Sequence, residues 1–333
     1  LHNALARSEE GALVSLLVKG QSGIGKTELL ERFERDLRHT RRDVVVLRGR
    51  CFAREAVPYK SFDAIMDGLS GHLAKLPVDD QRRLVPRHDE LLARAFPVLK
   101  RVELFTDPRV EREQVRDPQE QRGRVFTAVR TLFSRFAAST PLVVVLEDLQ
   151  WLDDDSRSLI GELLREPAPP HLLFLGTLRT EAGEPHEDEP ALLGGLPYES
   201  FTLLPLSDDE ALALAHSLLG GDDLAAPRAL AIVRESHGHP LFIDELARHA
   251  LSTATTEVGA LDLEQAIRAR IRTLGADVAV LLEALAVAAG PVTLDILARA
   301  TQLGTERVVR AATQCRIQRL VRMSGVRRSD TVE

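Results

Sequence analysis

The sequence predicts an α/β fold in which a parallel sheet is covered by helices on both faces and is followed by an all-helical half. Three observations lead to this prediction. Short apolar runs of strand length alternate with segments of helical periodicity through the first 205 residues. These runs are apolar on both faces, which is typical of parallel strands inside a covered sheet. After Pro205 and as far as Gln314 the periodicity is helical, with no strand of comparable strength.

The first elements along the chain form a strand, a glycine loop and a helix. Residues 12–19 are an apolar run that ends at a glycine, and apolar side chains recur at helical spacing over 27–38. A second apolar run at 44–47 leads through a polar turn to a helical pattern over 61–73. Together these segments predict one strand–helix–strand–helix unit.

The middle of the chain completes the predicted first domain, residues 1–205. Helical spacing leads into the strongest apolar run, and two more strands follow; the four segments are 121–138, 141–146, 171–178 and 200–204. Before them, the stretch 77–118 is rich in Pro, Arg and Asp, with helical periodicity only around 91–99. We therefore expect residues 76–119 to be an insertion on the surface.

The second half begins with the helix start Ser207-Asp208-Asp209-Glu210, which combines an N-cap serine with an acidic first turn. Residues 206–275 are expected to form a helical lid domain, with further helices over 224–235, 240–251 and 263–273. Three short helices and a strand with a turn follow, at 281–289, 294–300, 306–316 and 320–328. This is the winged-helix order, so a winged-helix-like domain is expected over 276–333. Because the chain starts at Leu1 and ends without closing an element, we expect a fragment in which this domain is truncated.

Composition and charge exclude several classes of protein. Hydrophobic residues make up 44% of the 333 residues and charged residues 28%, as in a globular protein. A formal net charge of -7 argues against a surface built to hold nucleic acid. No apolar stretch reaches the roughly 18 residues of a membrane-spanning helix, so no membrane partner is expected. Cys51 and Cys315 show neither metal-site nor disulfide spacing, and a cytoplasmic location is expected.

The strongest chemical motif lies between the first strand and the first helix after it. It fits the pattern G-x-x-x-x-G-K-[ST] and consists of Gly20, Gln21, Ser22, Gly23, Ile24, Gly25, Lys26 and Thr27. The glycines let backbone N–H groups point at phosphate oxygens, and the helix that follows adds its positive dipole end. We expect Lys26 to reach the β- and γ-phosphates and the Thr27 hydroxyl to ligate Mg²⁺. The pattern thus predicts a P-loop NTPase sheet that binds ATP with Mg²⁺.

Two acids, Glu147 and Asp148, follow the strongest apolar run, and the segment resembles a Walker B. In such sites one carboxylate orients a magnesium-bound water, and its neighbour polarises the water that attacks the γ-phosphate. By position, Glu147 is assigned to the metal and Asp148 to the attacking water. The usual order is Asp then Glu, so the second side chain is one methylene shorter here and slow hydrolysis is predicted. The alternative is an acidic helix start without a catalytic role.

Three further motifs carry weaker predictions. The strand at 171–178 delivers Thr177 and Arg179 to the sheet edge where ligands gather; either could sense the γ-phosphate, or Arg179 could simply close the strand at the surface. Pro240 sits at a helix start after a glycine and a histidine. Five C-terminal arginines could contact DNA phosphates, although solvation is favoured because no base-reading residues accompany them: Arg316, Arg319, Arg322, Arg327 and Arg328.

The combination of motifs resembles one family. The chain looks like the AAA-type, origin-recognition-like ATPase module of the STAND class. The motifs that carry this resemblance are GQSGIGKT, VVVLEDLQW with the acids 153–155, LGTLR and HGHPLF. Such modules belong to bacterial multidomain regulators, fused to serine/threonine protein kinases, adenylate cyclases or maltose-regulator-like activators and usually followed by tetratricopeptide repeats. GRC at 49–51 and VPY at 57–59 match the kinase-fused members.

This resemblance implies roles beyond those of the phosphate loop. In the family the Gly-x-Pro turn approaches the nucleotide and couples its state to the winged helix, so Pro240 is expected to sense adenine and phosphate. The adenine-contacting Gly-Arg-x-x-Glu element is expected just upstream of Leu1. The implied partners are covalently attached signalling or repeat domains, and self-association that depends on the nucleotide is a further option.

Three functions stay open at this point. The favoured one is a regulatory switch in signal transduction or transcription control, in which ATP closes the helical and winged-helix domains onto the sheet and ADP holds another packing. The alternative is a DNA-binding AAA ATPase of origin-recognition type, which the net acidity weakens. A small-molecule kinase is least favoured because no acceptor-binding element stands out.

Overall fold

The structure is a computed structural model that divides into two compact units, Leu1–Leu203 and Leu204–Glu333. It describes the whole chain except residues 53–57, 88, 107–116, 181–192, 194, 196, 221–224, 253–261, 289, 319, 322, 324–326, 328–329 and 333. None of the helices in the described part combines the length and apolar character needed to cross a membrane. Cys51 and Cys315 are both buried and carry free thiols.

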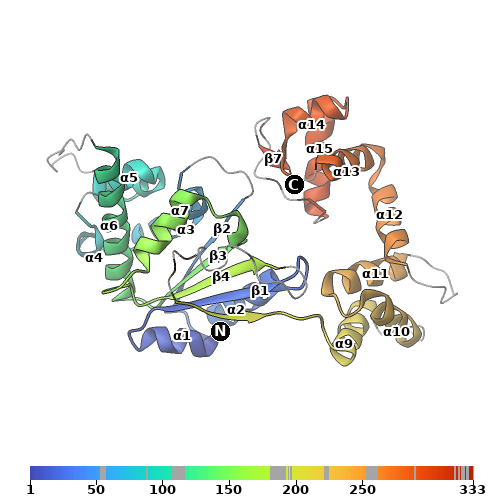
Figure 1. Ribbon diagram of the computed structural model, residues 1–333, viewed down its shortest axis with the longest axis horizontal. Helices are drawn as coiled ribbons and strands as arrows, with labels where there is room; N and C mark the ends of the chain where they lie inside the picture. The colour runs from blue at the N-terminus through green and yellow to red at the C-terminus, as the bar shows by residue number, and fades with distance from the viewer. Residues whose placement is uncertain are drawn as a thin grey trace. The chain divides into compact units, whose positions relative to one another are not determined.

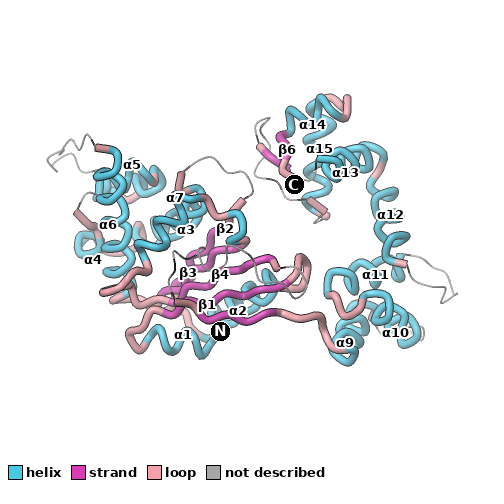
Figure 2. Tube along the Cα trace, viewed as in Figure 1, coloured by secondary structure: helices cyan, strands magenta, loops and turns pink. Residues whose placement is uncertain are grey.

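A five-stranded parallel sheet forms the centre of the first unit (Figure 2). Its strands run in the order β2-β3-β4-β1-β5, and each pairs in parallel with its neighbours. They are β1 (Val14–Gly20), β2 (Val45–Arg50), β3 (Leu142–Glu147), β4 (Leu173–Arg179) and β5 (Glu199–Thr202). All five overlap the apolar runs in the sequence, and the predicted α/β class with a parallel sheet is confirmed.

Helices cover both faces of this sheet (Figure 1). Side chains alternate between the two faces along a strand. Val143 and Val145 of β3 therefore belong to one core cluster, with α1 (His2–Glu9) and α2 (Lys26–Thr40). Val144 and Leu146 belong to the other, which also contains residues of α3 (Lys60–Leu73), α6 (Pro118–Ala137) and α7 (Asp154–Leu163). Covering on both faces explains why β3 is buried at every residue.

Within the stretch expected as a surface insertion, residues 76–106 apart from 88 contribute to the main core, so their expected surface location is wrong, while residues 88 and 107–116 lie outside the described part. Leu92, Phe96 and Leu99 are fully buried in the cluster that holds Val144 of the sheet. Each short element buries one to three apolar side chains, while Pro and Arg residues in and between the elements make the average composition look polar. These elements are α4 (Val78–Leu84), α5 (Asp89–Ala95) and the 3-10 turns η1 (Pro97–Arg101) and η2 (Glu103–Thr106).

The second unit is mostly helical and has two core clusters of its own. The first is formed by α9 (Asp208–Leu219), α10 (Ala225–Ser236), α11 (Pro240–Ser252) and α12 (Leu263–Leu274). The second is formed by α13 (Ala276–Ala288), α14 (Leu294–Ala300), α15 (Thr305–Ile317) and the antiparallel pair β6 (Val292–Thr293) and β7 (Thr331–Val332). The predicted cap of α9 is present, because Ser207 and Glu210 form a capping box.

Only part of the predicted C-terminal strand and turn can be compared with the structure. Within 320–328, Met323 forms an isolated antiparallel bridge with Val332, and residues 322, 324–326 and 328 lie outside the described part. Of the five C-terminal arginines, Arg319, Arg322 and Arg328 also lie outside it. The winged-helix assignment therefore stays a prediction.

Candidate nucleotide-binding site

The phosphate loop joins the end of β1 to the start of α2. Gly25 caps the helix with φ at +105°, a left-handed conformation that favours glycine. Gly20 also has a positive φ of +151°, and a Cβ at this position would lie 3.0 Å from the carbonyl oxygen of Leu203. The two glycines thus permit the curl that turns the backbone N–H groups and the helix start toward one place.

Lys26 folds back over this loop. Its Nζ donates hydrogen bonds to the carbonyl oxygens of Gly20 and Gln21, both at 2.7 Å, and the residue is only 8% exposed. These contacts keep the ammonium group against the loop. A cation held there can meet the negative charge of a phosphate that the loop amides bind.

The two residues assigned to the metal are in direct contact. Thr27 Oγ1 donates a hydrogen bond of 2.6 Å to Oε2 of Glu147, which joins the start of α2 to the end of β3. Hydroxyl and carboxylate oxygens are the donors that Mg²⁺ prefers, and in nucleotide sites one or two such groups act together with phosphate oxygens. The donor set of Thr27 and Glu147 therefore fits a magnesium ion.

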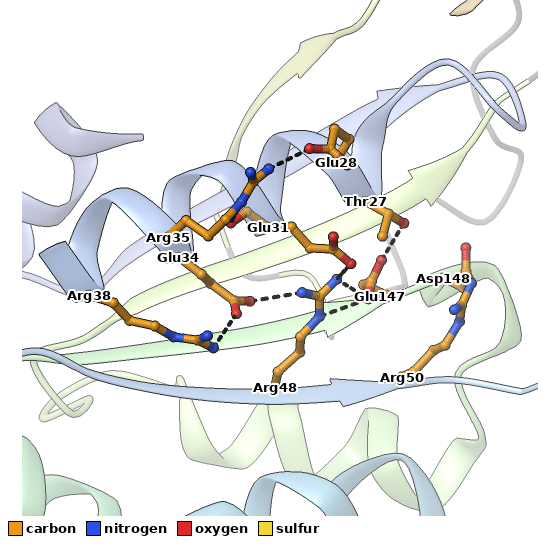
Figure 3. A network of polar contacts seen from close by, with 10 residues as sticks. All are labelled: Thr27, Glu28, Glu31, Glu34, Arg35, Arg38, Arg48, Arg50, Glu147 and Asp148. Carbon is orange, nitrogen blue, oxygen red and sulfur yellow. Dashed lines mark hydrogen bonds and ion pairs between the residues drawn. The ribbon is translucent and has the colours of Figure 1, made fainter. Parts of the chain in front are cut away.

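Arg48 of β2 holds the other oxygen of Glu147 (Figure 3). Its Nε and Nη2 donate to Oε1 of Glu147 at 2.9 and 2.7 Å, and its Nη1 donates to Oε1 of Glu34 at 3.0 Å. Burial opposes the charged form of Arg48, but the carboxylates of Glu147 and Glu34 outweigh it and raise the pKa of the guanidinium. Arg48 is thus held in its charged form between two buried carboxylates.

Asp148 has a parallel arrangement with Arg50. The Nε and Nη2 of Arg50 donate to Oδ2 of Asp148 at 2.9 and 2.6 Å. The backbone of Asp148 is left-handed, with φ at +58°, and its N–H donates to Oγ1 of Thr177 at 2.9 Å. Thr177 is 1% exposed, so its hydroxyl supports the backbone of the acid from inside the sheet.

The sequence pattern does not predict a role for either arginine, because the apolar run that marks the second strand ends before them, at Leu47. The register pairs Arg50 with Glu147 across β2 and β3, and side chains two residues apart on a strand share a face. The signal that predicts such pairs is two arginines spaced by one residue at the end of a strand, beside another strand that ends in two acids. That signal requires knowing which strands are neighbours.

Arg179 and Pro240 differ in where the structure places them. Arg179 ends β4 directly opposite Gly20 of β1, with its backbone N–H donating to Oε1 of Gln150 at 3.1 Å. Pro240 starts α11 in the second unit, beyond Gly238, whose φ is +74°. Lys26, Thr27 and Glu147 thus lie together at the phosphate loop. The sensing roles of Arg179 and Pro240 stay predictions.

A glycine loop between a parallel strand and a helix, with a lysine over the loop and a carboxylate at its threonine, defines a P-loop nucleotide-binding protein. The family model "AAA ATPase domain" matches residues 1–175. The chain belongs to this family, and it is an AAA ATPase module that binds nucleotide.

Comparison with curated proteins gives no match. Solved structures with a similar fold include the Orc1 protein of Aeropyrum pernix in complex with DNA, with 16% identity over 99% of this chain and 85% of that chain and a TM-score of 0.44. Cdc6p from Pyrobaculum aerophilum has 12% identity over 99% and 86%, with a TM-score of 0.41. The RuvB branch migration motor of Thermotoga maritima has 14% identity over 100% and 89%, with a TM-score of 0.38.

Proposed function

We propose that the chain is the ATP-dependent switch module of a bacterial multidomain regulator in signal transduction or transcription control, and that it binds Mg-ATP and hydrolyses it slowly. The hydrogen bond between Thr27 and Glu147 supports the Mg-ATP part of this proposal, because a hydroxyl and a carboxylate in contact at the end of the phosphate loop are donors suited to Mg²⁺. The AAA ATPase family supports nucleotide binding. Assignment to the STAND class, fusion to a kinase and a cytoplasmic location belong to the proposal.

In this proposal the loop amides and Lys26 would hold the β- and γ-phosphates, and Thr27 and Glu147 would hold a Mg²⁺ ion that would neutralise phosphate charge. Asp148 polarises the attacking water. Its Oδ2 already accepts two hydrogen bonds from Arg50, so the carboxylate must act through its other oxygen or leave this pair. Together with the short side chain, this pairing supports slow hydrolysis.

The second unit is proposed to be the part of the chain that changes its packing with the nucleotide. The helical lid at 206–275 and the winged-helix-like domain at 276–333 are proposed to pack differently with ATP and with ADP, because a ligand shifts a conformational equilibrium only if it binds the two states unequally. Arg179 at the γ-phosphate and Pro240 at the nucleotide are the proposed sensors. Attached signalling or repeat domains and nucleotide-dependent self-association are the proposed readouts.

Limited proteolysis with ATP, with ADP and without nucleotide tests the switch. We expect the ATP and ADP forms to give different cleavage patterns, and Lys26→Ala to remove the difference because it cannot hold the phosphates. Lys75→Ala, which removes an exposed lysine elsewhere in the first unit, is the matched control and should behave as wild type. Identical cleavage of wild-type chain in both nucleotides would contradict the switch.

DNA binding is not part of the proposal, because the net charge of -7 disfavours a polyanion partner. The assay that would reinstate the DNA-binding ATPase is a duplex titration at several salt concentrations. Affinity that falls steeply with salt, with a slope of several phosphate contacts, would favour it over the switch.

A further inference from the structure

The network around Glu147 carries an inference about which metal the site accepts (Figure 3). We propose that Arg48 is a positioning residue that lets the Glu147 carboxylate offer one oxygen only to a divalent ion, and that it thereby selects Mg²⁺ over Ca²⁺. This inference rests on the proposed Mg-ATP site and names a determinant of its specificity.

The two oxygens of Glu147 have different partners. Oε1 accepts two hydrogen bonds from Arg48, from Nε at 2.9 Å and from Nη2 at 2.7 Å. Oε2 accepts the hydroxyl of Thr27 at 2.6 Å. A carboxylate oxygen has about two lone-pair sites, and the charge-assisted bonds of the guanidinium fill both on Oε1. Only Oε2, on the side of the phosphate loop, is left to serve a metal.

Arg48 is itself held in place from α2. Glu34, which is 6% exposed, accepts from Nη1 of Arg48 at 3.0 Å, and Glu31 lies 3.9 Å from Nη2. The planar guanidinium thus bridges Glu34 and Glu147 in a fixed orientation. Glu34 and Thr27 both lie on α2, so one helix carries the acid that holds Arg48 and the hydroxyl that faces Oε2.

The coordination preferences of Mg²⁺ and Ca²⁺ explain why a carboxylate with one available oxygen favours Mg²⁺. Mg²⁺ is small and demands near-octahedral coordination, whereas Ca²⁺ takes six to eight oxygens and accepts bidentate carboxylates. A carboxylate restricted to one oxygen satisfies Mg²⁺ and withholds the second contact from which Ca²⁺ would gain. Releasing Oε1 therefore favours Ca²⁺ relative to Mg²⁺.

The test compares the concentrations of Mg²⁺ and Ca²⁺ that half-saturate binding of a non-hydrolysable ATP analogue. In wild type we expect Mg²⁺ to act at the lower concentration. In Arg48→Gln we expect the Ca²⁺-to-Mg²⁺ concentration ratio to fall by up to about tenfold, taking as a scale the lower end of the loss in metal affinity when a residue that orients a ligand is removed. Because both ions carry the same charge, the lost positive charge of Arg48 cancels from this ratio.

Two more variants make the result specific. Arg48→Lys keeps a counter-charge for the buried Glu34 and Glu147 but cannot make the paired contact, so it should fold and show a smaller fall in the ratio. Arg38→Gln is the matched control, because Arg38 contacts Glu34 at 3.4 Å from a largely exposed position and has no contact with Glu147 among those described. Its ratio should equal that of wild type.

Wild-type ratios in both Arg48 variants would overturn the inference, and so would an equal fall in Arg38→Gln. The Mg-ATP site would be unaffected by either result. If the wild-type chain failed to bind the analogue in either ion, both the proposed Mg-ATP site and the role of Arg48 would be wrong. Failure of the site can therefore be distinguished from failure of the Arg48 proposal alone.

Discussion

At the scale of single residues, the acids at the end of β3 depend on cations from the neighbouring strand. Glu147 and Asp148 are 4% and 8% exposed, and buried carboxylates are costly unless they are paired and hydrogen-bonded. Arg48 and Arg50 supply that pairing from the same face of β2. The two acids have separate partners, so each can be tested without touching the other.

The role assigned to Asp148 leads to a prediction for Asp148→Asn. The amide keeps the shape of the side chain but cannot accept a proton, so we expect single-turnover ATP cleavage to slow by about 100-fold or more. ATP affinity should stay near wild type, because Asp148 is not assigned to the metal. The control is Asp154→Asn, whose side chain is 98% exposed at the start of α7. Cleavage at the wild-type rate in Asp148→Asn would exclude Asp148 as the residue that polarises water.

How far the sequence predicts this site depends on how its residues are linked along the chain. Lys26 and Thr27 lie within one eight-residue motif, and the two acids directly follow an obvious strand, so local patterns suffice for them. Arg48 contacts an acid 99 positions away, and only the pairing of β2 with β3 brings the two together. Contacts that depend on strand order are not visible in a single sequence without a topology.

At the scale of elements, close packing at Gly176 shows why β4 has a glycine in its interior. A Cβ there would lie 2.5 Å from Cδ1 of Leu149 and 2.5 Å from Cδ2 of Leu17. Both leucines are fully buried, so neither can move away into solvent. The glycine in the LGTLR motif thus lets β4 and its neighbours pack.

Gly176→Ala should therefore destabilise the first unit. Overpacking of this kind typically costs about 1–3 kcal/mol, which lowers the melting temperature in a thermal unfolding experiment. Gly123→Ala in α6 is the control, because a Cβ there meets nothing within 4 Å and alanine favours a helix. Equal melting temperatures for Gly176→Ala and wild type would show that the leucines adjust freely.

At the scale of the whole molecule, the sequence indicates the layer structure better than it indicates how one segment is buried. Alternating apolar runs and helical patterns predict the parallel sheet and the helical second half, because periodicity reports which faces are covered. The same patterns do not predict the burial of the described residues within 76–119, where short elements bury Leu92 and Phe96 in a segment whose average composition is polar. Composition averaged over a segment does not show whether a few large apolar side chains reach the core.

We expect the loop from Gly20 to Thr27 to hold a nucleoside triphosphate together with Mg²⁺ at Glu147, and every other proposed role depends on this binding. Isothermal titration of the wild-type chain with ATP, in Mg²⁺ and in excess chelator, tests it most directly. We predict saturable binding that is tighter with Mg²⁺ and is lost in Lys26→Ala, while Lys75→Ala binds as wild type. If folded wild-type chain showed no saturable binding heat when titrated with ATP in Mg²⁺, the proposed nucleotide site would be wrong.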